Sequence, residues 1–179
     1  STGPMNILYL SADRGIPVRG HKGAAVHVRA MAGAFCQAGH SVTILTPRPG
    51  PSDGPAPQAE IVEVPLPPMS PATDEATARD LQSWAYAGVL FDAARAIIAG
   101  EVVSLAGESS QKDVRSWSCF DFIYERYSLW SDVGARLAEA TGLPFVLEVN
   151  APLIEEASRY RSLGDVALAG EIERRQLAA

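Results

Sequence analysis

Short apolar runs alternate with amphipathic segments along the chain, and this alternation is typical of an α/β protein. Runs rich in strand-forming residues predict five β-strands, at residues 7–10, 41–46, 59–64, 120–124 and 145–149. Apolar residues spaced three or four positions apart predict helices after four of these runs, over about 24–38, 73–99 and 131–141 and from 152 onward. This order predicts a Rossmann-like, mostly parallel sheet with helices on both faces. Glu171 and Arg175, four positions apart, predict a solvated helical tail.

The first strand and the first helix are joined by a polar loop that is punctuated by glycine. Gly20 and Gly23 flank Lys22 in this loop, just before the helical pattern begins. The first backbone N–H groups of a helix have no partner within the helix, so a helix N-terminus attracts anions. Glycine lets the backbone approach a ligand closely, and a lysine adds a positive charge. The loop is therefore predicted to contact the phosphate-bearing part of a ligand.

Composition narrows the class of protein. The 179 residues are 47% hydrophobic, which suits one domain with a real core over residues 5–179, and residues 1–4 read as a remnant of the expression vector. A net charge of −6 without a basic stripe argues against nucleic-acid binding. No apolar run approaches the roughly 18 residues of a membrane span. The two cysteines, Cys36 and Cys119, stand in no CxxC motif, so a reducing, cytoplasmic location is expected.

Polar residues gather where the predicted strands end. Ligands of open parallel sheets bind at the carboxyl ends of the strands, so one shared rim is the predicted site. The residues at these ends are Ser11, Asp13, Arg14, Thr46, Arg48, Glu125, Arg126, Glu148 and Asn150. Two interpretations remain open for Glu148, which either pairs with an arginine such as Arg126 or is kept for function, because an unpaired buried carboxylate is costly.

Several named motifs are missing from the chain. Gly15 and Gly20 have the spacing of a phosphate-binding P-loop, but no Ser or Thr follows Lys22. No acidic residue ends the second strand to hold an NAD ribose, and an NADP site that uses Arg48 stays as an alternative. His21 and His27 have no third ligand nearby in the sequence, so no metal site is predicted. No GxSxG motif or Cys/His pairing indicates a covalent nucleophile.

Taken together, three stretches resemble a known family. They are MNILYLS, GHKGAAVHVRAMAGAFCQAGHSVTILTP and FDFIYERYSLWSDVGARLAEATGLPFVLEVNAPLIEEASRYR. Their combination resembles the N-terminal, acceptor-side domain of family 4 glycosyltransferases of GT-B architecture. The resemblance implies a retaining enzyme that moves a sugar from a UDP- or GDP-linked donor to a sugar or lipid-linked acceptor. It also implies that no metal or other cofactor is needed.

The resemblance also implies roles for single residues. The glycine loop that faces the donor's phosphates maps onto Gly20, Lys22, Gly23 and Ala24. Many members carry a histidine just after the fifth strand, near the reacting sugar, and Asn150 stands at that place here. An amide cannot transfer protons as a histidine does, but it can hydrogen-bond a sugar hydroxyl. The candidate catalytic residues are Asn150 and Glu148. The candidate substrate-binding residues are His27, Arg126, Glu125 and Asp13.

The family's C-terminal domain, which grips the nucleotide, has no counterpart in this sequence. The chain is therefore expected to be one half of a GT-B fold that lacks its donor-binding domain and is inactive alone. The full-length protein could touch a membrane peripherally. Two alternatives remain: an NADP-linked or other nucleotide-binding Rossmann oxidoreductase, and a non-catalytic α/β binding module.

Overall fold

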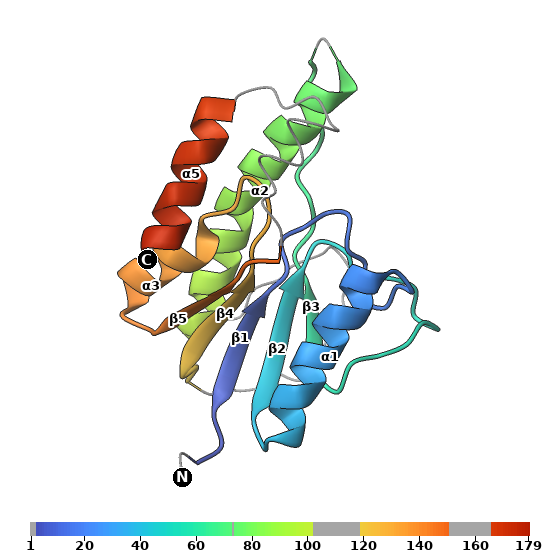
Figure 1. Ribbon diagram of the computed structural model, residues 1–179, viewed down its shortest axis with the longest axis vertical. Helices are drawn as coiled ribbons and strands as arrows, with labels where there is room; N and C mark the ends of the chain where they lie inside the picture. The colour runs from blue at the N-terminus through green and yellow to red at the C-terminus, as the bar shows by residue number, and fades with distance from the viewer. Residues whose placement is uncertain (1–2, 73, 102–118, 151–165) are drawn as a thin grey trace.

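The structure, a computed structural model, describes residues 3–72, 74–101, 119–150 and 166–179. Its centre is a sheet of five parallel strands in the order β3-β2-β1-β4-β5 (Figure 1). The strands are β1 (Asn6–Leu10), β2 (Ser41–Thr46), β3 (Glu60–Glu63), β4 (Phe122–Arg126) and β5 (Phe145–Glu148). Strand order reverses between β1 and β4, which is where open parallel sheets hold ligands. The predicted Rossmann-like α/β fold is confirmed.

One face of the sheet is covered by α1 (Gly23–Gln37). Side chains of a strand alternate between the two faces, so Ile7 and Tyr9 of β1 point to this side. They pack with Val28 and Ala32 of α1 in one buried cluster. The apolar spacing in the sequence therefore predicted the buried stripe of this helix correctly.

The opposite face is covered by α2 (Glu75–Ile98) and α3 (Val133–Thr141), so helices lie on both faces as predicted. The Asp74 side chain caps α2 by accepting a hydrogen bond from the Thr77 backbone N–H at 2.8 Å. The helix α3 ends at Gly142, which adopts a left-handed conformation (φ 74°). The first half of α2 extends beyond the carboxyl ends of the strands, so it overhangs that rim (Figure 1).

A last helix, α5 (Val166–Ala178), lies beside α2 and α3 (Figure 1). The tail was predicted to be a solvated helix. Glu171 and Arg175 are exposed as this prediction requires, but one stripe of the helix is buried. Ala169 (2% exposed) and Ile172 (8%) pack against Trp130, and Gln176 (1%) is buried as well. Because the third residue of this buried stripe is the polar Gln176, the spacing of apolar residues does not reveal the stripe.

The described helices include none that is both long enough and apolar enough to cross a membrane. The helix predicted from residue 152 and the stretch 102–118 lie outside the described residues.

The fourth strand begins and ends two residues later than the sequence predicted. It was expected at 120–124, which placed Glu125 and Arg126 beyond its end, but the observed strand is Phe122–Arg126. Glu125 pairs in register with Leu10, and Arg126 pairs with Glu148. The two charged side chains therefore lie within the sheet and point to opposite faces.

Candidate functional site

A polar cluster around Glu148 lies at the carboxyl ends of β4 and β5, on the face covered by α1. The side chains of Tyr124, Arg126 and Glu148 point to this face because they occupy alternate or paired strand positions. Arg126 Nη1 donates to Glu148 Oε1 at 3.0 Å, and His27 Nε2 of α1 lies 2.9 Å from the same oxygen. The Asn150 side-chain amide also donates to Oε1, while the Tyr124 hydroxyl donates to Oε2.

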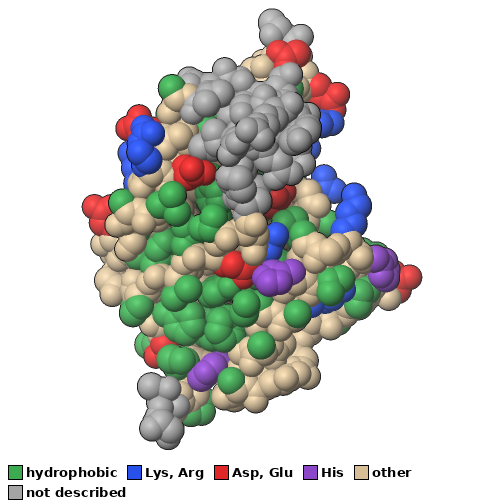
Figure 2. Space-filling model, in the orientation of Figure 1, with side chains coloured by type: hydrophobic (Ala, Val, Ile, Leu, Met, Phe, Trp, Pro, Cys, Tyr) green, Lys and Arg blue, Asp and Glu red, His purple; other side chains and the backbone are tan. Residues whose placement is uncertain are grey.

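This cluster joins four of the predicted site residues. Acidic, basic and histidine side chains meet in the middle of the face shown in Figure 2. His27 brings the start of α1 into contact with Glu148, which in turn contacts Arg126 and Asn150. Both candidate catalytic residues, Glu148 and Asn150, therefore lie together at the rim.

Electrostatics keep the Glu148 carboxylate ionised. Burial raises its pKa, but the hydrogen bonds from Asn150 and Tyr124 and the charges of His27 and Arg126 outweigh burial, so the pKa lies below its usual range. Burial raises the pKa of the Tyr124 hydroxyl, and the hydrogen bond to Glu148 and its negative charge raise it further. The pairing with Arg126 that the sequence left open is present. Glu148 acts as a hub that contacts four side chains around it.

The glycine loop lies next to this cluster and is braced from two sides. The Arg29 guanidinium donates at 2.6 Å to the carbonyls of Val18 and of Gly20. The backbone N–H of Val18 donates to the Arg48 carbonyl at 2.9 Å, which ties the loop to the segment after β2. Arg48 thus takes part in this brace through its backbone.

The N-terminus of α1 is not capped by a side chain. Lys22 is the N-cap residue and makes no capping hydrogen bond, and the first turn contains no acidic residue. The positive end of the helix dipole at Gly23 and Ala24 is therefore not offset locally. Lys22 and Gly23 are exposed, so this end can receive an anion.

The two glycines of the loop differ in the space around them, and this difference can be tested. A Cβ atom at Gly20 would lie 2.7 Å from Pro17 Cγ and 2.9 Å from the Pro17 carbonyl oxygen, whereas one at Gly23 would meet nothing within 4 Å. We expect Gly20→Ala to lower the free energy of unfolding by about 1–3 kcal/mol. Gly23→Ala should leave it unchanged or raise it by up to about 1 kcal/mol. Urea unfolding of both variants checks this, and equal effects would contradict it.

Two buried hydroxyl groups lie on the same face as the cluster. Neither the Tyr9 hydroxyl nor the Ser11 hydroxyl has a hydrogen-bond partner among the described residues. The Tyr9 ring lies 4.9 Å from the Tyr124 ring, and burial together with the Glu148 charge raises the pKa of Tyr9. Buried polar groups are normally satisfied, so water or a ligand is expected beside them. Within the described residues no three His, Cys, Asp or Glu side chains group as metal ligands.

Glu125 was predicted to contact substrate, and the structure contradicts the rim position on which that prediction depended. Its side chain is fully buried on the other face of the sheet. Its carboxylate accepts hydrogen bonds from Ser131 Oγ at 2.6 Å and from the Gly134 backbone N–H at 2.8 Å, and also from the Gln176 amide. Burial raises the pKa of Glu125 to about 7 despite these hydrogen bonds. A carboxylate enclosed in this way braces α3 and α5 and is not accessible to a substrate.

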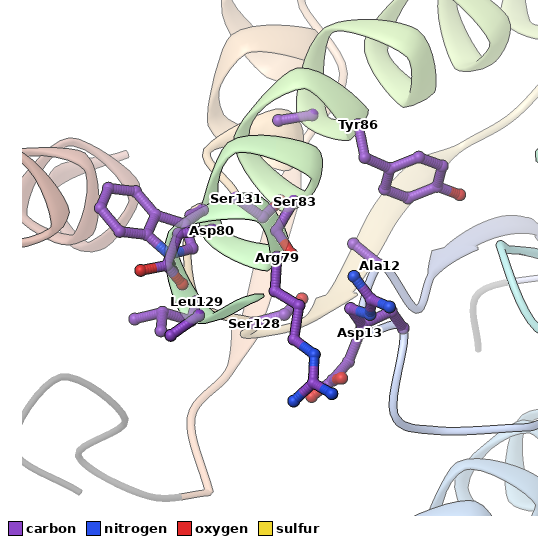
Figure 3. A pocket seen from close by; sticks show the side chains of 13 residues that line it. Ala12, Asp13, Arg79, Asp80, Ser83, Tyr86, Ser128, Leu129 and Ser131 are labelled. Carbon is purple, nitrogen blue, oxygen red and sulfur yellow. Dashed lines mark hydrogen bonds between the residues drawn. The ribbon is translucent and has the colours of Figure 1, made fainter. Parts of the chain in front are cut away.

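Asp13 lies apart from the Glu148 cluster, in a hollow elsewhere on the same rim. This hollow, the α2 pocket, has a volume of about 420 Å³ and is formed by the loop after β1, the overhanging half of α2 and the loop after β4 (Figure 3). Its polar lining residues are Asp13, Arg14, Arg79, Asp80, Ser83, Ser128 and Ser131. The sequence pattern did not predict Arg79, Asp80 and Ser83 as site residues, because helical periodicity does not reveal that a helix overhangs a rim.

No curated protein sequence matches the chain. A solved crystal structure described as the glycotransferase of kitacinnamycin matches with a TM-score of 0.44 and 18% sequence identity. The match covers 97% of this chain and 39% of that chain, so the chain spans about two fifths of that protein's length.

The family model described as a glycosyl transferase 4-like domain matches residues 22–178. This range begins at the N-cap of α1 and includes His27, β4, β5 and Asn150. The match favours the glycosyltransferase interpretation over the oxidoreductase alternative. The chain belongs to the glycosyl transferase 4-like domain family.

Proposed function

We propose that this chain is the N-terminal, acceptor-side half of a GT-B glycosyltransferase that moves a sugar from a UDP- or GDP-linked donor to an acceptor with retention of configuration. The observation that carries the proposal is the meeting of the uncapped α1 N-terminus with the Glu148 cluster at one rim of the sheet. Family membership supplies the sugar-transfer chemistry. A second domain of the same polypeptide would grip the nucleotide.

Each part of the rim has a role in this proposal. The N–H groups of Gly23 and Ala24, with Lys22 beside them, stabilise negative charge that develops on the leaving diphosphate. Gly20 shapes the loop that presents them. His27 and Asn150 hydrogen-bond hydroxyl groups of the transferred sugar.

Glu148 is a positioning residue in this proposal. Its two oxygens already accept four hydrogen bonds, from His27, Arg126, Asn150 and Tyr124. A nucleophilic attack by this carboxylate would break several of them. Holding His27, Arg126 and Asn150 in a fixed geometry is the role that its contacts support.

The experiment compares this 179-residue chain with a longer product that includes the reading frame after Ala179. We expect the longer product to release UDP or GDP from a sugar donor such as UDP-glucose or GDP-mannose, while the shorter chain releases none. The reason is that transfer needs two domains to close over the donor and exclude water. Nucleotide release is measured over a panel of donors, and the anomeric configuration of the product is read by NMR. NADPH binding without any use of sugar nucleotides would contradict the proposal, and an inverted product would contradict retention.

A substitution at the hub tests the proposed site within the longer product. We expect Glu148→Ala to lower kcat about 100-fold, because His27, Arg126 and Asn150 lose their common anchor. Glu139→Ala is the matched control, since Glu139 is an exposed carboxylate on α3. Circular dichroism confirms that both variants fold. Equal activity of the two variants would show that the cluster is not part of the site.

A further inference from the structure

The α2 pocket offers a second binding site on the same rim. It lies on the sheet face opposite the Glu148 cluster, between α2 and the loops that follow β1 and β4. Figure 3 shows the Arg79 side chain extending from α2 in the direction of Asp13 and Ser128. The pocket therefore opens at the carboxyl ends of the strands, where a substrate of the proposed reaction would enter.

Its walls are held in place by contacts that do not depend on a ligand. Trp130 is 5% exposed, adopts a φ of 70° and donates from its indole N–H to Asp80 Oδ1 at 3.2 Å. The Tyr86 hydroxyl donates to the Val64 carbonyl at 2.9 Å. The hollow is thus a formed feature with a fixed shape.

The two aspartates of the pocket are held by hydrogen bonds, whereas its two arginines are less firmly paired with opposite charges. Asp13 Oδ1 accepts from the Gly15 backbone N–H at 2.7 Å, and Asp80 holds the Trp130 indole. Arg14 donates instead to the neutral side chain of Gln82 and, among the described residues, lies within ion-pair distance of no carboxylate. Gln82 is itself fixed, because its amide donates to the Pro67 carbonyl at 2.7 Å. Arg14 is therefore presented in a set orientation. Asp13 and Glu75 attract its charge from a distance, but within the described ranges neither lies in ion-pair contact with it.

Arg79 adds a second positive charge that is free to turn toward a ligand. Its partner is Glu75, but both side chains are mostly exposed (56% and 72%), and ion pairs of this kind contribute little. Burial lowers the pKa of Arg14, and the charges of Arg79 and Arg48 lower it further. Arg14 and Arg79 line the same pocket, so an anion placed between them would relieve the repulsion of their like charges.

We propose that the α2 pocket binds the acceptor of the reaction through an anionic group, a phosphate or a carboxylate, held between Arg14 and Arg79. This inference rests on the function proposed above, because it names the acceptor as the ligand. A guanidinium group donates to phosphate or carboxylate oxygens in a planar, forked geometry that suits both. The hydroxyl groups of Ser83 and Ser128, which also line the pocket, offer hydrogen bonds to the rest of the acceptor.

The test titrates the 179-residue chain with three probes that differ in charge: glucose 6-phosphate, glucuronate and glucose. Binding is followed by two-dimensional NMR of the Trp130 indole N–H, assigned from the signal that Trp130→Phe removes. We expect the two anionic probes to bind at least about ten-fold more tightly than glucose, and their binding to weaken as salt is raised. The tighter of the two identifies phosphate or carboxylate as the group. Equal binding of glucose would overturn the proposal.

Variants then locate the binding. Arg14→Gln should weaken binding of the anionic probes about ten-fold, and Arg79→Gln about three-fold because its side chain is more exposed. Arg95→Gln is the matched control, since Arg95 is an exposed arginine in the last turn of the same helix. Lys22→Gln tests the N-terminus of α1 as the competing anion site. Loss of binding in Lys22→Gln with no loss in Arg14→Gln or Arg79→Gln would overturn the proposal.

The two proposals fail in different ways. A longer product that uses no sugar nucleotide contradicts the proposed function, whatever the pocket binds. A longer product that transfers sugar only to uncharged acceptors, at rates that Arg14→Gln and Arg79→Gln leave unchanged, contradicts the pocket's assigned ligand alone.

Discussion

Gly134→Ala is expected to lower the free energy of unfolding by about 3 kcal/mol or more, a large part of the stability of an ordinary domain. A Cβ atom at this position would lie 2.2 Å from Phe145 Cε2 and 2.6 Å from Glu125 Oε2. Neither neighbour can yield easily. The ring of Phe145 packs into the core beneath α3, and Glu125 is fully buried and held by hydrogen bonds. The helix would have to move away from the sheet.

Urea unfolding of both proteins measures the effect. Gly33→Ala serves as the matched control, because Gly33 lies inside α1 and a Cβ there would meet nothing within 4 Å. We expect this control to raise stability by up to about 1 kcal/mol, since alanine favours a helix more than glycine does. A loss below about 1 kcal/mol for Gly134→Ala would show that α3 is not packed against β5 this closely.

Glu125 should make the protein less stable as the pH rises from about 4.5 to about 7. Burial raises its folded-state pKa to about 7, while in the unfolded chain a glutamate titrates near 4.3. Between these values the folded state binds more protons than the unfolded state. Folding is therefore favoured at the acid end of this window, and that stability is lost as the pH passes through the folded pKa. The loss is on the order of 4 kcal/mol at most.

Glu125→Gln is the variant that isolates this effect. A glutamine can still accept from the Gly134 N–H and can donate to Ser131 Oγ, so the packing is kept while the titration is removed. Urea unfolding of both proteins at pH 5, 6, 7 and 8 measures the free energy of unfolding. We expect it to fall from pH 5 to pH 7 in the wild type and not in Glu125→Gln. Glu148, whose pKa is lowered, contributes pH dependence only at more acid pH and is common to both proteins. Parallel pH profiles would contradict the assignment.

Local sequence patterns predicted most of the fold. All five strands were predicted within two residues of their observed ends, because each is a short apolar run bounded by polar or turn-forming residues. The first helix, with Gly39 after it, and the third, with Gly142 after it, follow from apolar spacing and from glycine at the stop positions. The gathering of Arg126, Glu148 and Asn150 at one rim followed from the rule that parallel strands end on the same edge, whereas His27 was named through the family resemblance.

The errors arose where a residue's surroundings come from distant parts of the chain. Glu125 was placed at the open rim, but α3 and Gln176 of α5 enclose it. Gln176 follows Glu125 by 51 positions, and no local pattern links the two. The buried stripe of the tail helix was missed for the same reason, since Ala169 and Ile172 pack against Trp130.

The sequence by itself determined the element types, the parallel sheet and the edge at which the polar strand-end residues gather, because strand and helix periodicity are local properties of the chain. Only the tertiary structure decided which face each charged side chain occupies and what encloses it. A shift of β4 by two residues brought Glu125 and Arg126 into the sheet, where they point to opposite faces. The overhang of α2 brought Arg79 to the same pocket as Arg14. These placements depend on how the helices and strands pack in three dimensions, and no single segment of the sequence specifies that packing.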